Sequence, residues 1–203
     1  KSVDLVLCED TRTTKKLLDA YSIVVPTASY NVKSTMAKKE YIFSLLAEGK
    51  NIALVSDAGT PCISDPGVLI VSQVREHFGD VVTVVPIPGP SALITALSAS
   101  GSKSSEFTFL GFLPHKKGRE TLFKEIAASE RTMVLYESPH RISKTLEAFQ
   151  KFLGPDRTII IARELTKVFE QFVTGSPSEV KEYFIQHPDK VRGEFVVIVE
   201  GRK

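Results

Sequence analysis

The sequence predicts an α/β protein of two domains, and two patterns lead to this prediction. In the first half of the chain, short apolar runs alternate with amphipathic stretches, which is typical of a parallel sheet whose strands are joined by helices. The runs are nearly continuous in apolar residues, as expected for parallel strands covered on both faces. In the second half, two runs follow one another with no helix between them, so some strands pair antiparallel and the sheet is mixed.

The first domain is predicted from its alternating elements in chain order. We expect strands at residues 3–8, 51–55 and 82–85, and helices at about residues 11–20, 34–48, 67–78 and 90–101. Gly49 ends the second of these helices. Pro90 opens the fourth and Gly101 closes it, which is the favoured placement of proline and glycine at helix ends.

The second domain follows a small, polar segment at residues 102–106, which is the best linker candidate in the chain. We therefore expect an N-terminal α/β domain of residues 1–103 and a C-terminal mixed α/β domain of residues 104–203. In the second domain, strands are expected at residues 107–112, 132–136, 158–162, 169–174 and 194–199, and helices near residues 120–128, 141–152 and 178–186.

Composition places the chain among soluble globular proteins, because 42% of its 203 residues are hydrophobic and 25% are charged. No apolar run approaches the roughly 20 residues that a membrane span needs, so we expect a cytoplasmic protein without membrane contact. Two cysteines, Cys8 and Cys62, are too few for a disulfide scaffold. Neither is spaced from a histidine as a metal site requires, so no metal cofactor is expected.

Charge alone does not predict a nucleic-acid-binding protein, since the formal net charge is only +2. Basic residues do form short local clusters, and these are Arg12 with Lys15 and Lys16, Lys38 with Lys39, and Lys116 with Lys117 and Arg119. Such clusters are more often solvated helix faces than phosphate sites.

The most informative stretch is residues 56–67, Ser-Asp-Ala-Gly-Thr-Pro-Cys-Ile-Ser-Asp-Pro-Gly, between a buried strand and a helix. Ligands of open α/β sheets bind where strands end. Gly59 permits a positive φ and close backbone approach, while Pro61 and Pro66 hold the loop so that Asp57 is presented in a fixed place.

A purely structural interpretation of this stretch is also open. Ser64 or Asp65 would then cap the following helix. That interpretation leaves residues 57–60, including the hydroxyl of Thr60, unexplained.

A second constrained loop, residues 86–92, again joins a strand to a helix, so the two loops are expected to form one wall of a pocket. Pro88 and Pro90 flank Gly89, whose missing side chain lets a flat ligand lie on the backbone, and Ser91 is able to hydrogen-bond locally. Neither loop is the glycine fingerprint of dinucleotide folds or a P-loop, which disfavours NAD binding and ATP hydrolysis.

Two polar clusters follow strands in the second half. Residues 135–141 contain Glu137, His140 and Arg141 at one strand end, which suits polar ligand contacts. The alternative is a helix cap with a surface histidine. Residues 163–167 include Glu164, and that cluster is equally open to being an internal ion pair of little energetic consequence.

Six motifs in chain order resemble the ribosomal RNA small subunit methyltransferase I family, of the tetrapyrrole methylase superfamily. They are Cys8-Glu9-Asp10-Thr11-Arg12, Val55-Ser56-Asp57-Ala58-Gly59-Thr60-Pro61, Pro88-Gly89-Pro90-Ser91-Ala92, Gly111-Phe112-Leu113-Pro114, Tyr136-Glu137-Ser138-Pro139-His140-Arg141 and Ala162-Arg163-Glu164-Leu165-Thr166-Lys167. Each motif alone is weak, but six in register over almost the whole chain are specific.

The resemblance implies a tetrapyrrole-methylase-like fold that binds S-adenosylmethionine in a cleft between its two domains. It also implies a homodimer that methylates the 2′-oxygen of a cytidine in 16S rRNA, as naked RNA or in the small ribosomal subunit. Members of the family begin with a further strand and a loop of the type Ala-Thr-Pro-Ile-Gly-Asn-Leu, and the present sequence starts after that loop. Two alternatives are a tetrapyrrole methyltransferase of the same fold and a non-catalytic RNA-binding assembly factor.

Site residues are carried over from the matching motifs. The cofactor contacts implied are Asp57, Ala58, Gly59, Thr60, Ile63, Pro88, Gly89, Pro90, Ser91, Ala92, Phe112, Leu113 and Pro114. A hydroxyl nucleophile is weak while protonated, so a general base is expected, and the candidates are Glu137, His140 and Glu164. Phosphate contacts are expected from Arg12, Lys116, Lys117 and Arg141.

Overall fold

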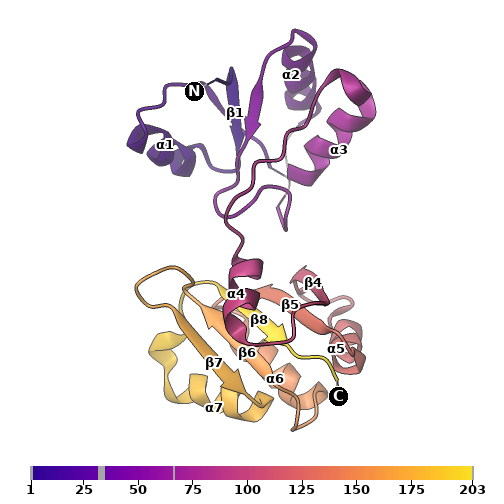
Figure 1. Cartoon of the computed structure of the whole chain (residues 1–203), viewed down its shortest axis with the longest axis vertical. Helices are drawn as coiled ribbons and strands as arrows, with labels where there is room; N and C mark the ends of the chain where they lie inside the picture. The colour runs from indigo at the N-terminus through magenta and orange to yellow at the C-terminus, as the bar shows by residue number, and fades with distance from the viewer. Residues whose placement is uncertain (1, 32–34, 66, 203) are drawn as a thin grey trace. The chain divides into compact units, whose positions relative to one another are not determined.

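The computed structural model describes residues 2–31, 35–65 and 67–202, and the contacts within it divide the chain into two units (Figure 1). Unit 1 is Lys1–Pro90 and unit 2 is Ser91–Lys203. This division differs from the boundary expected after residue 103 by one helix, α4 (Ala92–Ser100), whose buried residues pack on the sheet of unit 2. No helix in the described part of the chain is long and apolar enough to span a bilayer.

Unit 1 is built on a three-stranded parallel sheet in the order β2-β1-β3, as the first half of the sequence predicts. Its elements are β1 (Leu5–Cys8), α1 (Thr11–Ala20), β2 (Thr27–Ser29), α2 (Met36–Ala47), β3 (Ile52–Leu54), α3 (Gly67–Phe78) and the short 3₁₀ helix η1 (Gly79–Val81). Helices α2 and α3 cover one face of the sheet, where Leu5 and Leu7 pack with Ile42, Ile70 and Val74.

Two details of unit 1 differ from expectation. Residues 82–85 were predicted as a strand, but they join neither sheet of the described residues. Val82 and Val84 do pack against the core, while Val81 and Val85 are 86% and 65% exposed. The alternation therefore reports which side chains are buried, whereas a strand also needs a neighbouring backbone at about 4.8 Å.

Strand β2 was not predicted, because its three residues, Thr-Ala-Ser, contain no apolar run. It is a strand because its backbone pairs with β1, from Val6 opposite Thr27 to Cys8 opposite Ser29. The helix expected from about residue 34 begins at Met36, and Ser34 itself lies outside the described residues.

Unit 2 contains a five-stranded mixed sheet in the order β4-β5-β8-β6-β7, in agreement with the prediction. Strands β4 and β5 are parallel, and the other three pairs are antiparallel. Its elements after α4 are β4 (Phe107–Phe112), α5 (Arg119–Ala128), β5 (Thr132–Glu137), α6 (Ile142–Phe152), β6 (Ile159–Arg163), β7 (Gln171–Gly175), α7 (Pro177–Gln186), the 3₁₀ helix η2 (Pro188–Lys190) and β8 (Phe195–Val199).

The two faces of this sheet are covered unequally. Helices α5, α6 and α7 bury the larger core on one face, and α4 alone packs on the other, as Figure 1 also shows. Side chains alternate between the two faces along each strand. The larger core therefore buries more apolar side chains than the other face and is expected to contribute more to the stability of unit 2.

Ile161, which is fully buried in the larger core, provides a test of that packing. We expect Ile161→Val to lower the free energy of unfolding by about 0.5–1.5 kcal/mol, because it removes one methylene and leaves a small cavity. Urea denaturation measures the change. Ile185→Val makes the same substitution at a side chain that is 60% exposed, and it should leave the midpoint unchanged. Equal shifts in both variants would contradict the assignment of this core.

Candidate functional site

The loop that follows β3 is held in a fixed turn by its own hydrogen bonds. Ser56 Oγ donates to the carbonyl oxygens of Ala58 and Gly59, at 3.1 and 3.2 Å. Gly59 has φ +72°, a conformation that favours glycine. Asp57 is exposed, and its Oδ1 accepts from the backbone N–H of Asp10 at 3.3 Å. A hydrogen bond therefore connects the loop after β1 to the loop after β3, at the carboxyl ends of adjacent parallel strands.

The second half of the same loop prepares the start of α3. Asp65 Oδ1 accepts from the N–H of Gly67 at 2.7 Å, and its Oδ2 accepts from the N–H of Cys62 at 2.8 Å. These bonds agree with the structural interpretation, because both carboxylate oxygens of Asp65 accept hydrogen bonds within the turn. The expected stiffening by Pro66 falls outside the described residues.

The two constrained loops are in contact with each other. Thr60 Oγ1 donates to the carbonyl oxygen of Pro90 at 3.1 Å. A Cβ at Gly59 would lie 3.7 Å from that same oxygen, so the loops are in van der Waals range. Residues 86–90 are all exposed, as are Asp57 and Ala58. Exposed, rigid backbone from two loops is thus presented in one place, and this is the central feature of the candidate site.

Ser91 and Ala92 begin α4 and unit 2. Ser91 is the N-cap residue, and its Oγ accepts from the N–H of Ile94 at 3.5 Å. Ala92 is exposed in the first turn. In unit 1, the remaining predicted cofactor residue, Ile63, has a side chain that is 49% exposed.

Carboxylates gather around the joined loops of unit 1. Burial raises the pKa of Glu9, and the negative charges of Asp65 and Asp57 raise it further. The neighbouring Asp10 behaves in the opposite way, because hydrogen bonds from the side chain and backbone of Arg12 lower its pKa to about 2. The carboxylates make this end of the sheet favourable for a cationic ligand.

In unit 2, the predicted loop follows β4. Gly111 has φ +62°, and the register of β4 against β5 shifts between Phe109 and Phe112. Phe112 is 50% exposed, and its ring lies 5.5 Å from that of Tyr136. Leu113 is 2% exposed and belongs to the larger core, so the groups it can offer to a ligand are those of its backbone.

The three candidate bases occupy different environments. Glu137 is fully buried at the end of β5, and its Oε2 accepts from Thr145 Oγ1 at 2.6 Å. His140 is exposed on the turn that leads into α6. Glu164 follows β6, with β8 between its strand and that of Glu137, and its Oε1 pairs with Lys167 Nζ at 3.0 Å. The structure brings Glu137 and His140 onto one turn but leaves Glu164 on another.

The cluster around Glu137 also contains Thr145 and Arg119, neither of which was assigned to this site from the sequence. Arg119 Nη2 donates to Thr145 Oγ1 at 2.8 Å. Only the fold places α5 and α6 together, and no spacing in the sequence indicates this pairing. Arg141 also turns toward Glu137, with Nε 3.4 Å from Oε1, and its side chain is 17% exposed.

The predicted phosphate contacts are exposed in two places. Lys116 and Lys117 lie in the turn between β4 and α5. Arg12, 87% exposed, forms a two-point ion pair with Asp10, in which Nε and Nη2 donate at 3.0 and 2.6 Å. Arg12 is therefore already partnered, whereas no ion pair is recorded for either lysine among the described residues.

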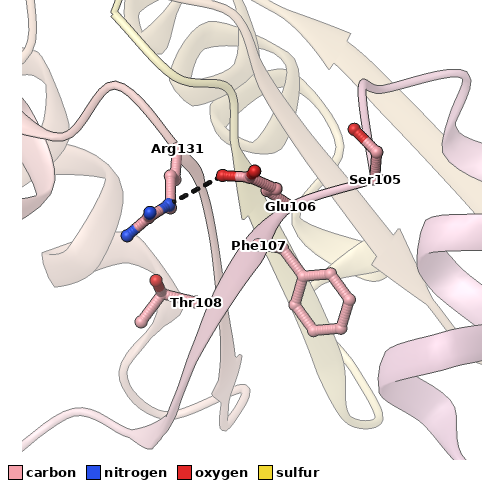
Figure 2. A pocket seen from close by; sticks show the side chains of 5 residues that line it. All are labelled: Ser105, Glu106, Phe107, Thr108 and Arg131. Carbon is pink, nitrogen blue, oxygen red and sulfur yellow. Dashed lines mark hydrogen bonds and ion pairs between the residues drawn. The ribbon is translucent and has the colours of Figure 1, made fainter.

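A hollow of about 340 Å³ lies at the start of β4, away from all of these residues (Figure 2). Figure 2 shows Glu106 reaching Arg131, with Phe107 and Thr108 on opposite sides of the strand. The Glu106–Arg131 pair is exposed, which makes it a weak interaction. None of the predicted site residues lines this hollow. Across the described residues, no three His, Cys, Asp or Glu side chains gather as metal ligands would.

Comparison with known proteins identifies the relatives of this chain. Residues 1–181 match the family described as Tetrapyrrole (Corrin/Porphyrin) Methylases. A ribosomal RNA small subunit methyltransferase I of Haemophilus influenzae is 45% identical over 201 residues, which cover 98% of this chain and 70% of that protein. The protein of the same name from Bacillus subtilis is 45% identical over 202 residues, 99% of this chain and 67% of that protein.

Solved structures with the same fold are more distant in sequence. A cobalt precorrin-4 methyltransferase of cobalamin biosynthesis superposes with a TM-score of 0.66 at 13% identity, over 98% of this chain and 84% of that chain. The uroporphyrin-III C-methyltransferase of Thermus thermophilus, complexed with S-adenosyl homocysteine, gives 0.63 at 16% identity, over 98% and 86%. At these identities the likeness establishes a shared fold.

Proposed function

Because the chain belongs to the tetrapyrrole methylase family, and within it to the ribosomal RNA small subunit methyltransferase I group, we propose that it transfers a methyl group from S-adenosylmethionine to small-subunit ribosomal RNA. The acceptor we propose is the 2′-oxygen of a cytidine ribose in 16S rRNA. The observation that supports this best is the joined pair of loops, linked by Thr60 and Pro90 at the carboxyl end of a parallel sheet.

The residues at the joined loops fit S-adenosylmethionine chemically. The cofactor carries a cationic sulfonium, and Glu9, Asp57 and Asp65 supply negative charge beside exposed backbone. A related fold is described in complex with S-adenosyl homocysteine, which is the product of methyl transfer. When bound, the cofactor would supply an electrophilic methyl carbon.

The cofactor contacts that we propose are those implied by the family resemblance. From unit 1 they are Asp57, Ala58, Gly59, Thr60, Ile63, Pro88, Gly89 and Pro90, and from unit 2 they are Ser91, Ala92, Phe112, Leu113 and Pro114. The side chain of Asp57 and the backbone at Gly89 are both exposed. Leu113 would act through its backbone, since its side chain is buried.

We assign the general base to His140. His140 is exposed on the turn before α6, so its imidazole is accessible to a ribose hydroxyl whose proton it would accept. Glu137 is enclosed by hydrogen bonds and ion pairs, and Glu164 is paired with Lys167. Positioning of the reactants is expected to supply the larger part of the rate enhancement.

Lys116 and Lys117 are the phosphate contacts that we retain in unit 2, because both are exposed. To Arg141 we assign a structural role in place of the phosphate contact expected from sequence, since its Nη2 donates to the carbonyl oxygen of Leu113 at 2.6 Å. Arg12 stays a predicted contact that would have to leave Asp10.

Reversing both charges, in Lys116→Glu with Lys117→Glu, should weaken RNA binding uniformly across sequences. The negative slope of log affinity against log salt should become less steep by roughly 1.5, because two phosphate contacts are lost. Filter binding between 50 and 200 mM salt measures this slope. Over that range, a full interface of phosphate contacts loses about 10³–10⁵-fold in affinity. The control is Lys151→Glu with Lys181→Glu on α6 and α7, and a slope that changes equally there would remove Lys116 and Lys117 from the RNA surface.

One assay separates the three functional hypotheses. The protein is incubated with S-adenosylmethionine labelled in its methyl group and with naked 16S rRNA, assembled small subunits or a porphyrin. Label in 2′-O-methylcytidine after nuclease digestion supports the proposal, and label in the porphyrin supports a tetrapyrrole methyltransferase. Binding of RNA without any transfer indicates an assembly factor. The homodimer stays a prediction, which light scattering would test.

A further inference from the structure

A buried carboxylate at the end of β5 lies at the centre of a polar cluster in unit 2. Glu137 is 0% exposed, so its charge must be compensated by protein groups. Its Oε1 accepts from the N–H of Ser138 at 2.9 Å, and its Oε2 accepts from Thr145 Oγ1 at 2.6 Å. Two guanidinium groups complete the shell, with Arg141 Nε at 3.4 Å and Arg119 Nη2 at 3.9 Å.

Both arginines also reach the loop that follows β4. Arg141 Nη2 donates to the carbonyl oxygens of Leu113 and Pro114, at 2.6 and 3.3 Å. Arg119 Nη1 donates to the carbonyl oxygen of Pro114 at 3.1 Å. Each guanidinium therefore lies between the Glu137 carboxylate and a backbone carbonyl, which a planar fork of donors is suited to do.

The loop needs such support because the ladder ends before it. The pairing of β4 with β5 shifts after Phe109 and ends at Phe112, and Gly111 turns the backbone with φ +62°. Beyond Phe112, the carbonyl groups of Leu113 and Pro114 accept hydrogen bonds from arginine side chains, and not from a neighbouring strand. The position of the backbone here thus depends on where the guanidinium groups are held.

Glu137 is what allows two cations to lie together. Burial lowers the pKa of Arg119, the positive charge of Arg141 lowers it further, and the Glu137 carboxylate acts in the opposite direction. Without the carboxylate the two guanidinium groups would repel each other in a site where water screens them poorly. Thr145 links the parts, since it donates to Glu137 and accepts from Arg119 Nη2 at 2.8 Å.

We propose that Glu137 is a positioning residue, which fixes the backbone of Leu113 and Pro114 through Arg119 and Arg141 and thereby presents this loop to the cofactor. The role replaces that of general base, which was one expectation for Glu137. It rests on the proposed function, because that function assigns residues 112–114 to S-adenosylmethionine. The Glu137 cluster acts on cofactor affinity, and the proton of the ribose hydroxyl does not pass through it.

The test compares Glu137→Gln with wild type in two measurements. Calorimetry should show S-adenosylmethionine binding weakened about 10-fold, equivalent to about 1.4 kcal/mol, with RNA affinity changed less than about twofold, because Lys116 and Lys117 reach phosphates through long, flexible side chains. Hydrogen exchange should become faster at the amides of Leu113, which is buried, and Arg119, which donates to the carbonyl oxygen of Lys116 at 3.2 Å, while the amides of β6 and β8 keep their protection. The matched control is Glu130→Gln, which breaks an exposed pair with Arg202 and should alter neither measurement.

Thr145 provides a milder pair of variants should Glu137→Gln fail to fold. Thr145→Val removes the hydroxyl that bridges Glu137 and Arg119, and it should reproduce the loss of cofactor affinity. Thr145→Ser keeps the hydroxyl and should restore affinity to within about twofold of wild type. If Thr145 had a purely structural role, Thr145→Val would lower cofactor affinity and RNA affinity together. Thr145→Ser would then not restore cofactor affinity selectively.

The outcomes separate this inference from the proposed function. Wild-type protein that binds S-adenosylmethionine while the Glu137→Gln and Thr145→Val variants bind it equally well overturns the positioning role alone. Wild-type protein that does not bind S-adenosylmethionine overturns the proposed function. In that case the hydrogen exchange of residues 113 and 119 still decides whether Glu137 holds the loop, and unchanged exchange in both variants overturns that as well.

Discussion

Gly59→Val is expected to weaken S-adenosylmethionine binding by at least about 100-fold while the protein stays folded, a loss of about 2.7 kcal/mol in binding free energy. Gly59 has φ +72°, where a β-branched residue is a strong outlier. A Cβ would already touch the carbonyl oxygen of Pro90 at 3.7 Å, so the γ carbons of valine would press on the second loop. The substitution therefore strains the first loop and separates it from the second.

A matched control is available at Gly49, which has φ +77° and open space around its missing side chain. Gly49→Val imposes the same backbone strain at the end of α2, and it should lower stability without changing cofactor affinity. Calorimetry with S-adenosylmethionine and thermal unfolding are measured on both variants. If Gly59→Val binds the cofactor as wild type does, the joined loops are not the cofactor site. If both variants lose binding equally, the loss reflects global strain.

The second large effect is expected at the proposed base. His140→Ala should lower kcat for methyl transfer by about 10²–10⁴-fold, because the ribose hydroxyl would lose the group that accepts its proton. Cofactor affinity should not change, since His140 is exposed and makes no recorded contact with the loop at residues 112–114. Single-turnover kinetics with saturating cofactor and RNA measure the step directly.

Chemical rescue distinguishes a base from a structural residue. Imidazole in solution should restore part of the activity of His140→Ala. Glu164→Gln serves as the comparison, and it should stay close to wild type because Glu164 is paired with Lys167. Full activity in His140→Ala together with a large loss in Glu164→Gln would transfer the role to Glu164.

The resemblance identified from six motifs is confirmed by the relatives, and the two kinds of sheet are confirmed by the structure. Hydrophobic periodicity predicted these because it reports burial directly, and burial was strongest in β1, β5, β6 and β8. The short strand β2 was missed, and a strand was wrongly predicted at residues 82–85, for the complementary reason. Strand formation there depends on whether a partner backbone is present, which local composition does not encode.

The candidate site shows the same division. Sequence alone located the loops at residues 56–67 and 86–92 and the polar turn at residues 135–141, since glycine, proline and short polar side chains dictate local backbone shape. The linker expected at residues 102–106 does not coincide with the division after Pro90, because α4 packs through Leu93, Ala96 and Leu97 on the sheet that follows it.

What only the tertiary structure decided is which charged groups are available for chemistry. Glu137 and Arg141 look in the sequence like free polar residues at a strand end, but the fold buries Glu137 against Thr145 of α6 and Arg119 of α5, and it pairs Arg141 with the same carboxylate. His140, between them in the chain, is left exposed. A residue's chemical role follows from its burial and its partners, and both are set by contacts between segments that lie far apart in the chain.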